Sequence, residues 1–391
     1  MCGLLLVPAG AIVGGVRAGG RRAGAGGAAR LPEPRAPICQ PGIVTRQQAH
    51  LVFAAFDVDA GSAGELGELF AAWSLAGARL MGGERSARDV QERGDSGEVQ
   101  ELAPAGLTVT LGLGPDVFER DRFGLADCRP AALRALPSFP GDELQPRRCG
   151  GDVCVQACAN DPQVAVHAVR TLARLGAGAA RLRSAQTGFI SVGTLEDRGR
   201  TPRNLFGFRE GARNVREPRE LERHVWISGR DRSWMLGGTY AVVRRIRMRV
   251  EAWDETAVAD QEQAIGREKV SGARFDDERF VKPPKPVPPG AHISLAGVDQ
   301  SDGTRMLRRS YNYFDGVDPV SGEPDMGLFF VCFVRDPRRQ FVPMQQRLSE
   351  RDPLNPFVTY TGGAVFAVPP APAPGRFVAQ GLFDGPGANG Y

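Results

Sequence analysis

Histidine is scarce in this chain, with four residues among 391, so few side chains could hold a metal ion through imidazole. Cysteine offers no better framework, because its seven residues are an odd number at irregular spacings. The densest run of thiols, from Cys149 to Cys158, fits no common zinc pattern. We therefore expect small buried thiols there, and neither a disulfide network nor a zinc site.

The chain also lacks a long hydrophobic run. Its most apolar segment, residues 1–16, is too short and too interrupted by glycine for a transmembrane helix. This segment resembles the hydrophobic core of an export signal without its basic start, and Arg21 and Arg22 follow the apolar run instead of preceding it. We expect residues 1–42 to be signal-like or disordered. We also expect the protein to be exported to the periplasm or the cell exterior, with a twin-arginine-type pathway as one possible export route. A disordered tail on a cytoplasmic protein is the alternative.

Neither sign of charge dominates the sequence. The net charge of +4 comes from arginines scattered among aspartates and glutamates, a pattern typical of a solvated surface. We therefore expect no nucleic-acid partner and no stable membrane insertion. A hydrophobic content of 42% in a chain of this length allows two ordinary domains with real cores.

The pattern of apolar residues predicts an α+β fold with two ferredoxin-like halves, each an antiparallel sheet with helices packed on it. In the N-terminal half, expected over residues 43–200, the predicted strands are 51–58, 107–112, 152–159 and 189–192, and the predicted helices are 65–80 and 161–175. In the C-terminal half, expected over residues 201–391, the predicted strands are 238–248, 327–334 and 363–368, and the predicted helices are 255–267 and one beginning at 337 and reaching about 347. The proline-rich stretch 281–290 should be a surface excursion.

Two segments outside these elements carry side chains suited to chemistry. One is 207–214, in which Glu210 stands between Gly207 and Gly211, and the other is 290–311, which contains His292 and Arg308. An imidazole can hold haem iron, while a carboxylate and a guanidinium can handle peroxide. Loops on a rigid scaffold are common places for such groups.

Several motifs, in order along the chain, resemble those of dye-decolorising peroxidases. Residues 207–214, Gly-Phe-Arg-Glu-Gly-Ala-Arg-Asn, resemble that family's Gly-Phe-x-Asp-Gly-x-x-Asn signature. Similarity to the exported, deferrochelatase-like branch extends over segments 42–48, 152–160, 237–248, 291–293, 306–309 and 327–330. The resemblance covers residues 41 to 370. It implies two ferredoxin-like halves, one b-type haem per chain in the second half, and hydrogen peroxide as the oxidant.

The resemblance also implies roles for particular residues. His292 matches the proximal iron ligand, Glu210 the distal acid–base aspartate, and Arg308 the distal arginine, with Arg309 as the competing assignment. The resemblance further implies haem contacts at four positions: Gly211, Ala212, Arg213 and Arg267.

The sequence departs from the family signature at two positions. Glu210 stands in place of aspartate, and Val215 in place of the usual proline. The extra methylene of glutamate moves the carboxylate by roughly an ångström, which is enough to affect the rate of catalysis but does not obviously threaten haem binding. The remaining histidines, His50, His167 and His224, are expected to be structural, and most tryptophans and tyrosines to belong to the core.

The expected function is that of a haem b peroxidase that reduces hydrogen peroxide and oxidises small aromatic or dye-like donors by one-electron steps. Three alternatives stay open: removal of iron from haem, as in a deferrochelatase; a weakly catalytic haem-binding protein; and a haem enzyme with a dedicated biosynthetic substrate. A homo-oligomer is compatible with the sequence.

Overall fold

The computed structural model describes residues 39–84, 96–191, 201–210, 214–229, 233–297, 300, 303–319 and 321–384. Residues 37–391 belong to one compact unit. Residues 1–38 of the expected signal-like segment 1–42 and the haem-contacting turn 211–213 lie outside the described residues. No helix in the described part of the chain is long and apolar enough to cross a membrane.

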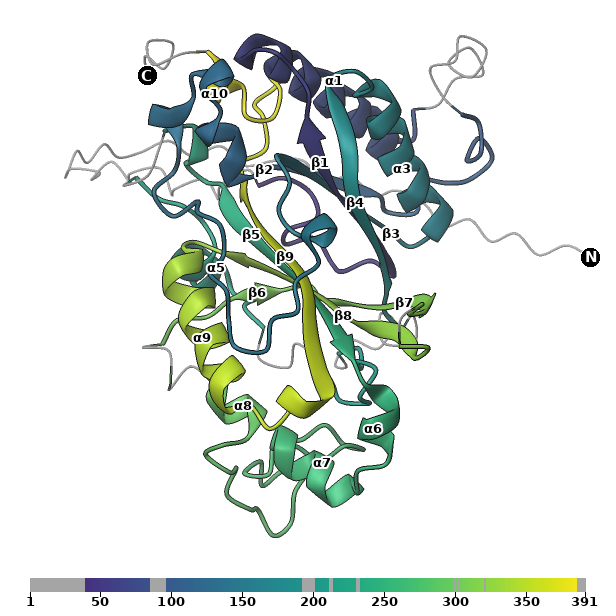
Figure 1. Ribbon diagram of the computed structural model, residues 1–391, viewed down its shortest axis with the longest axis vertical. Helices are drawn as coiled ribbons and strands as arrows, with labels where there is room; N and C mark the ends of the chain where they lie inside the picture. The colour runs from purple at the N-terminus through teal and green to yellow at the C-terminus, as the bar shows by residue number, and fades with distance from the viewer. Residues whose placement is uncertain are drawn as a thin grey trace, which may run out of the picture. The chain divides into compact units, whose positions relative to one another are not determined.

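The N-terminal half is a four-stranded antiparallel sheet with the strand order β2-β3-β1-β4. Its strands are β1 (His50–Val58), β2 (Thr108–Leu113), β3 (Val153–Ala159) and β4 (Ala180–Phe189). Two helices, α1 (Ala63–Gly82) and α3 (Pro162–Leu175), lie side by side over one face of this sheet (Figure 1). The C-terminal sheet covers the other face, which explains why all seven residues of β3 are buried.

Local sequence explains where α1 begins and ends. The Ser62 hydroxyl accepts a hydrogen bond from the Glu65 backbone N–H at 3.2 Å, and the Glu65 carboxylate accepts one from the Gly61 N–H at 2.8 Å. Gly83 ends the helix in the left-handed conformation at φ 73°. Between these ends, Phe70 and Trp73 are completely buried against the sheet.

The C-terminal half repeats the same strand order. Its strands are β5 (Thr239–Met248), β6 (Leu307–Arg308), β7 (Tyr311–Val317), β8 (Pro324–Val334) and β9 (Val358–Val368). β9, β5 and β8 pair in that order, and β6 and β7 both pair along the other edge of β8. The helices are α5 (Pro218–His224), α6 (Val250–Asp254), α7 (Val258–Ile265), α8 (His292–Leu295), α9 (Pro337–Arg351) and α10 (Gln380–Phe383).

Short 3-10 turns complete the described structure, at Pro115–Glu119, Asp121–Phe123, Ala126–Cys128, Pro146–Arg148, Ser233–Met235 and Asn355–Phe357. The predicted α+β class with two ferredoxin-like halves is confirmed by this topology.

The two sheets meet face to face and join at their edges. β2 pairs with β9 at Leu113 and Ala367, and β4 pairs with β7 at Phe189 and Asn312. Aromatic side chains fill the space between the sheets, where the Phe53 ring lies 5.4 Å from that of Phe329. The ring of strands therefore encloses an apolar core of its own, separate from the core under α1 and α3.

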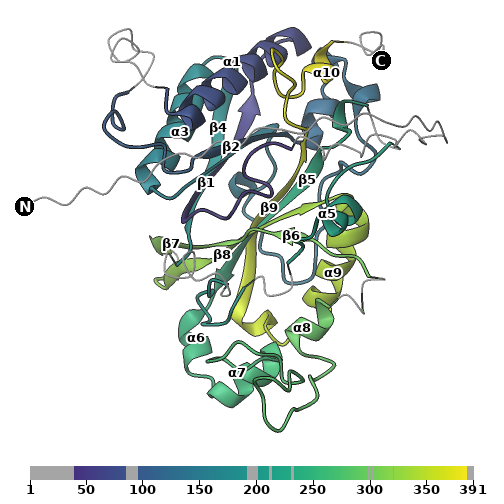
Figure 2. The same cartoon turned by 180° about the vertical axis from the view of Figure 1, so that it is seen from behind.

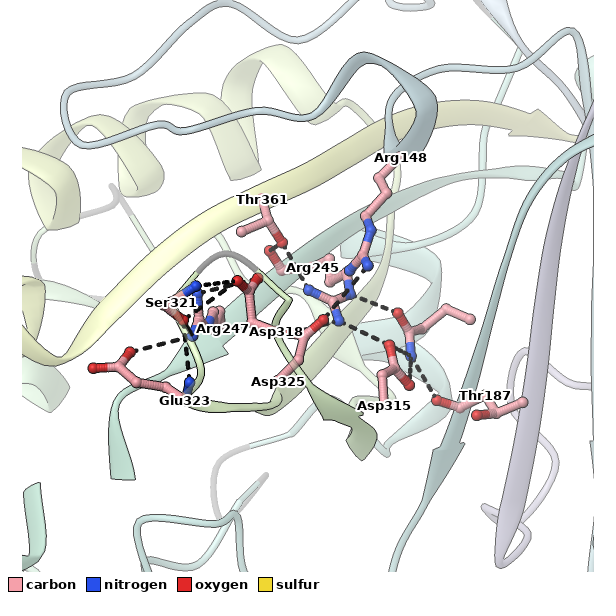
Figure 3. A network of polar contacts seen from close by, with 11 residues as sticks. Arg148, Thr187, Arg245, Arg247, Asp315, Asp318, Ser321, Glu323, Asp325 and Thr361 are labelled. Carbon is pink, nitrogen blue, oxygen red and sulfur yellow. Dashed lines mark hydrogen bonds and ion pairs between the residues drawn. The ribbon is translucent and has the colours of Figure 1, made fainter. Parts of the chain in front are cut away.

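A buried arginine ties the halves together between the sheets (Figure 3). Arg245 of β5 is 3% exposed and forms ion pairs with Asp315 of β7 at 2.8 Å and Asp325 of β8 at 2.9 Å. Its Nε also donates to Gln186 of β4, in the other half, at 2.7 Å. The Arg245 guanidinium lies over the Tyr313 ring, 4.0 Å from the centroid. The Arg245 guanidinium therefore has ion-pair, hydrogen-bond and aromatic partners, because a buried charge must be compensated by such contacts.

Two predicted elements are wrong in position. The fourth strand is β4 (Ala180–Phe189), not 189–192. The prediction missed it because one side of the strand is solvated, so its arginine, serine and glutamine residues give a weak apolar signal. The helix predicted at 255–267 is only Val258–Ile265, ended by Gly266 at φ 87°. The sequence pattern also missed β6 and β7, and Arg308 lies on the first of these and not in a loop. The six described cysteines are free; in the run from Cys149 to Cys158, Cys154 and Cys158 are buried as predicted, whereas Cys149 is half-buried.

Candidate active site

A pocket opens on the face of the C-terminal sheet that points away from the core between the sheets. In β5, Val243 and Arg245 point into that core, whereas Ile246 and Met248 point to the other side and line the pocket. Residues Leu328 and Phe330 of β8 and Val358 and Tyr360 of β9 continue the same wall. The helix α9 closes another side with Met344 and Leu348.

His292 stands at the edge of this pocket as the first residue of α8. Its Nδ1 lies 2.6 Å from Oδ2 of Asp352, the residue that caps the C-terminal end of α9. The other Asp352 oxygen accepts the Leu354 backbone N–H at 3.0 Å, so the carboxylate is fixed. Nδ1 is therefore the nitrogen that donates, and Nε2 is left for a ligand.

The surroundings of His292 favour its protonated form in the protein without a ligand. Burial lowers the pKa of the imidazole, but the charge and the hydrogen bond of Asp352 raise it more, so the pKa of His292 lies above its usual value. The carboxylate of Glu210 raises this pKa further and the guanidinium of Arg308 lowers it. Both groups therefore act electrostatically on the same imidazole.

Gly266 explains how α8 can lie so close to α7. A Cβ at this position would come within 2.8 Å of Val287 and 2.9 Å of Ile293. Glycine at φ 87° avoids both contacts and allows the chain to turn. The position of His292 thus depends on a glycine 26 residues earlier in the sequence.

Glu210 is held on the pocket wall by a turn that Asn204 organises. The Asn204 Oδ1 accepts the backbone N–H groups of Phe206 at 3.1 Å and Phe208 at 3.2 Å, and its Nδ2 donates to Glu210 Oε1 at 2.7 Å. Gly207, at φ 84°, permits the turn. Oε2 of Glu210 is left as the second acceptor. Sequence reasoning did not single out Asn204.

Arg308 is fixed to the Glu210 segment through Asn214. The Asn214 side chain accepts the Arg308 backbone N–H at 2.8 Å and donates to the Arg308 carbonyl at 2.7 Å, as a neighbouring strand would. Because side chains alternate along β6, Arg308 faces the pocket and Arg309 faces the other way. The buried guanidinium of Arg309 donates to Gln48 Oε1 at 3.1 Å and to the Thr45 carbonyl, outside the pocket.

Arg267 also lines the pocket, and its guanidinium donates to the Gly272 carbonyl at 2.9 Å. Further arginines on the same wall are Arg209, Arg244, Arg274 and Arg305. The other three histidines lie elsewhere: for example, His167 Nδ1 is 3.1 Å from Glu98 in the N-terminal half. The described residues contain no group of three or more His, Cys, Asp or Glu that could hold a metal ion.

The donor set of this pocket fits haem. One imidazole with a carboxylate behind it suits iron, because the porphyrin supplies the other nitrogen ligands. Apolar side chains from β8, β9 and α9 suit the faces of the macrocycle, and several arginines suit its propionates. Gln345 Nε2 is buried in the pocket wall without a hydrogen-bond partner, as expected for a donor whose acceptor is supplied by a bound ligand.

Comparisons with known proteins agree with this geometry. The family model of the Dyp-type peroxidase N-terminal domain matches residues 40–190, and that of the C-terminal domain matches residues 201–373. The chain is 36% identical over 364 residues to a deferrochelatase of Yersinia pestis, covering 88% of this chain and 83% of that protein. It is 35% identical over 346 residues to the deferrochelatase of Escherichia coli strain K12, covering 84% and 81%.

Solved structures give the same relationship. A DyP-type peroxidase from Streptomyces coelicolor superposes with a TM-score of 0.82 at 37% identity and covers 89% of this chain and 95% of its own. Ferric DtpA from Streptomyces lividans superposes with a TM-score of 0.82 at 36% identity, covering 89% and 96%. These matches extend over both halves and the pocket between β5, β9 and α9, and by them the chain belongs to the Dyp-type peroxidase family, with haem b as its expected cofactor.

Proposed function

We propose that this chain reduces hydrogen peroxide with haem b ligated by His292 and oxidises small aromatic donors one electron at a time. The observation that carries the proposal is the joint placement of the His292–Asp352 pair, Glu210 and Arg308 on one pocket. When bound, haem supplies the iron that gives electrons to peroxide and recovers them singly from the donor. The overall reaction is H2O2 plus two electrons and two protons giving two waters.

His292 Nε2 is proposed to bind the iron. Asp352 accepts a hydrogen bond from Nδ1–H, which fixes the tautomer and the orientation of the ring and makes Nε2 a stronger electron-pair donor to the metal. Arg267, with Gly211, Ala212 and Arg213, is proposed to contact the haem edge and its propionates, in agreement with the place of Arg267 on the pocket wall.

Glu210 and Arg308 are proposed to act on peroxide. Oε2 of Glu210 takes a proton from one peroxide oxygen and returns it to the other, so that water leaves. Arg308 has a permanent positive charge beside these oxygens and stabilises negative charge on the departing one. Asn204 positions Glu210. Asn214, which follows Glu210 in the chain, binds the backbone of Arg308.

The first test is Arg308→Leu. We expect haem to remain bound and the second-order rate of the peroxide-driven change in the haem spectrum to fall on the order of 10²-fold, because a preorganised charge is lost. Stopped-flow mixing measures this rate, and Arg351→Leu at the surface is the matched control. An unchanged rate in Arg308→Leu would contradict the assignment.

The second test concerns the glutamate at the usual aspartate position. Glu210→Asp should hold or raise the rate with peroxide, since it restores the family's side-chain length, whereas Glu210→Gln should lose it. If both variants slowed alike, the glutamate would serve another task. If wild type and both variants reacted at one rate, this carboxylate would move no proton.

Removal of iron from haem is the second candidate, because the curated relatives with 35–36% identity are named deferrochelatases. The two functions separate in two assays of the haem-loaded protein, one under reducing conditions without peroxide and one with peroxide and a dye. Metal-free porphyrin, seen by its fluorescence, supports the deferrochelatase reaction, and turnover of a dye with peroxide supports the peroxidase. Dye turnover without porphyrin release is the outcome we expect. A weakly catalytic haem-binding protein would show neither.

We also propose that the protein is exported, on the basis of the apolar residues 4–7 and 11–13 near the start of the sequence. Fractionation of cells that express the full chain tests this. Recovery of the protein only in the cytoplasm would contradict export, and would leave the peroxidase proposal intact.

A further inference from the structure

A second hollow, of about 1110 Å³, adjoins the pocket of His292. Thr304 and Gln340 line both spaces. The Gln340 amide donates to the Arg305 carbonyl at 2.5 Å and to the His224 carbonyl at 2.9 Å, which holds this shared wall in place. α5 and α9, which flank the hollow, lie near each other in both views of the molecule (Figures 1 and 2).

Positive charge dominates the lining of this hollow. Its only lining carboxylate among the described residues is Asp336, which is occupied in capping α9, because it accepts the backbone N–H of Arg338 at 2.9 Å. Against it stand five arginines: Arg134, Arg223, Arg335, Arg338 and Arg339.

Three of the five arginines are available to a ligand. Arg134, Arg223 and Arg338 are exposed and have no carboxylate partner among the described residues. Arg335 differs, because its Nε donates to the Trp226 carbonyl at 2.7 Å. The same positive field acts on His224, whose pKa is lowered by burial and then by the charges of Arg223 and Arg335.

Most of the remaining lining is small or apolar, and its polar members are His224, Ser228, Thr304 and Gln340. It includes Ala131, Ala132, Ala135, Leu136, Pro137, Ile227 and Val342. The apolar part of this surface offers contact to a flat ring, while the arginines attract an anionic group at the ring's edge and can also stack on its face. An aromatic anion is the ligand class that uses both features.

We propose that this hollow binds the electron donor of the peroxidase as an aromatic anion, such as an aryl sulfonate or aryl carboxylate. The inference rests on the proposed function, since it names the class of donor and its place beside the haem pocket. Two donor molecules each give up one electron, and one hydrogen peroxide accepts both electrons with two protons to form two waters.

Equilibrium binding of naphthalene-2-sulfonate to the haem-loaded protein tests the site without turnover. Isothermal titration calorimetry at low ionic strength should give one site, with an affinity that falls as salt is added. The variant Arg134→Gln/Arg223→Gln/Arg338→Gln should bind about tenfold more weakly or worse, because three exposed cations are lost. Arg46→Gln/Arg79→Gln/Arg351→Gln removes the same charge from exposed positions elsewhere and should bind as the wild type does.

Two further ligands decide between an aromatic anion and charge alone. Naphthalene-2-methanol, which has the ring without the charge, should bind weakly and equally to all three proteins. Inorganic sulfate should compete poorly with the sulfonate. Competition by sulfate at equal concentration would overturn the aromatic part of the proposal, and equal sulfonate affinity in all three proteins would overturn the site. If the triple variant has an altered circular dichroism spectrum, Arg338→Gln alone, with a loss of twofold to threefold, replaces it.

Kinetics separate this proposal from the proposed function. With peroxide, the triple variant should have a raised KM for an aryl sulfonate donor and an unchanged kcat, while turnover of the neutral donor guaiacol should not change. If the wild type binds the sulfonate but oxidises no donor, the peroxidase assignment fails and the binding site stands. If guaiacol turnover is normal and the KM for the sulfonate donor is the same in both variants, the peroxidase stands and the donor site fails.

Discussion

The two halves of the molecule share one strand order, yet the His292 pocket lies in the second half alone. In the first half, the connection from β1 to β2 contains α1, a helix of 20 residues whose Trp73 is completely buried. In the second half, the corresponding connection contains α6, α7 and α8, of five, eight and four residues. The comparison teaches that the pocket lies where three short helices stand in place of one long helix over the same order of strands, and that the last of them, α8, contributes His292.

The link between the halves can be broken at Arg245. Arg245→Met leaves Asp325, which is 10% exposed, with only the longer contact to Arg148 at 3.5 Å, so we expect the free energy of unfolding to fall by about 3 kcal/mol. Arg247→Met on the same strand is the control: its partners Asp318 and Glu323 are 18% and 50% exposed, and the loss should stay below about 1 kcal/mol. Urea unfolding followed by tryptophan fluorescence measures both (Figure 3). Equal losses would mean that the buried network contributes no more to stability than the exposed one.

Two substitutions that enlarge a side chain, one in each half, test the difference in packing between the halves. A Cβ on Gly77 of α1 would already contact Val109 of β2 at 3.4 Å, so Gly77→Leu should destabilise the protein by about 2 kcal/mol and leave haem binding unchanged. Met344→Trp projects into the pocket instead, so the haem-free protein should lose less than about 1 kcal/mol.

Haem titration compares the haem affinity of the same two variants. Met344→Trp should weaken haem binding more than tenfold, while Gly77→Leu should bind haem as the wild type does. The reverse pattern would mean that the second half is as closely packed as the first, and that haem binds elsewhere.

The smallest expected effect lies in the first half and depends on pH. Burial raises the pKa of Glu98, but hydrogen bonds from Ser96, from its own backbone and from His167 lower it more, to about 2. A lowered pKa stabilises the fold above the unfolded value of 4.5, and this contribution is lost as the pH falls towards about 2.

Because solvent screens this partly exposed carboxylate, Glu98→Gln should be less stable than the wild type by only about 1 kcal/mol at pH 7, with the gap closing below pH 4.5. Urea titrations at several pH values measure the gap, and haem binding should not change. A gap of constant size down to pH 3 would show that the charge of Glu98 contributes nothing.

Most of the first half could be predicted from the sequence, and less of the second. Strands such as β1 and β3 are buried on both faces, and α3 has a clear apolar side, so their residues carry a strong signal. β4 and β6 carry little, because the first alternates with arginines and the second has only two residues. The pattern also could not show that Arg308 faces the pocket and Arg309 does not, since this depends on the pairing of β6 with β8.

The acceptor behind His292 was likewise beyond the sequence. Asp352 lies 60 residues later, in a polar run at the end of α9, and nothing local marks it. Only the packing of α8 against α9 brings the two side chains together. Asn204 was missed for a similar reason, because an asparagine in a turn is common and its contact with Glu210 depends on the path of the loop.

Titration of haem into His292→Ala is the measurement that tests the account most directly, with His50→Ala on β1 as the matched control. If the pocket beside α8 holds haem through Nε2 of His292, the control should take up one haem per chain with the Soret band of the wild type. His292→Ala should then show no saturable uptake, because no other histidine lines the pocket among the described residues. A His292→Ala protein with one tightly bound haem and an unchanged Soret band would contradict the central claim.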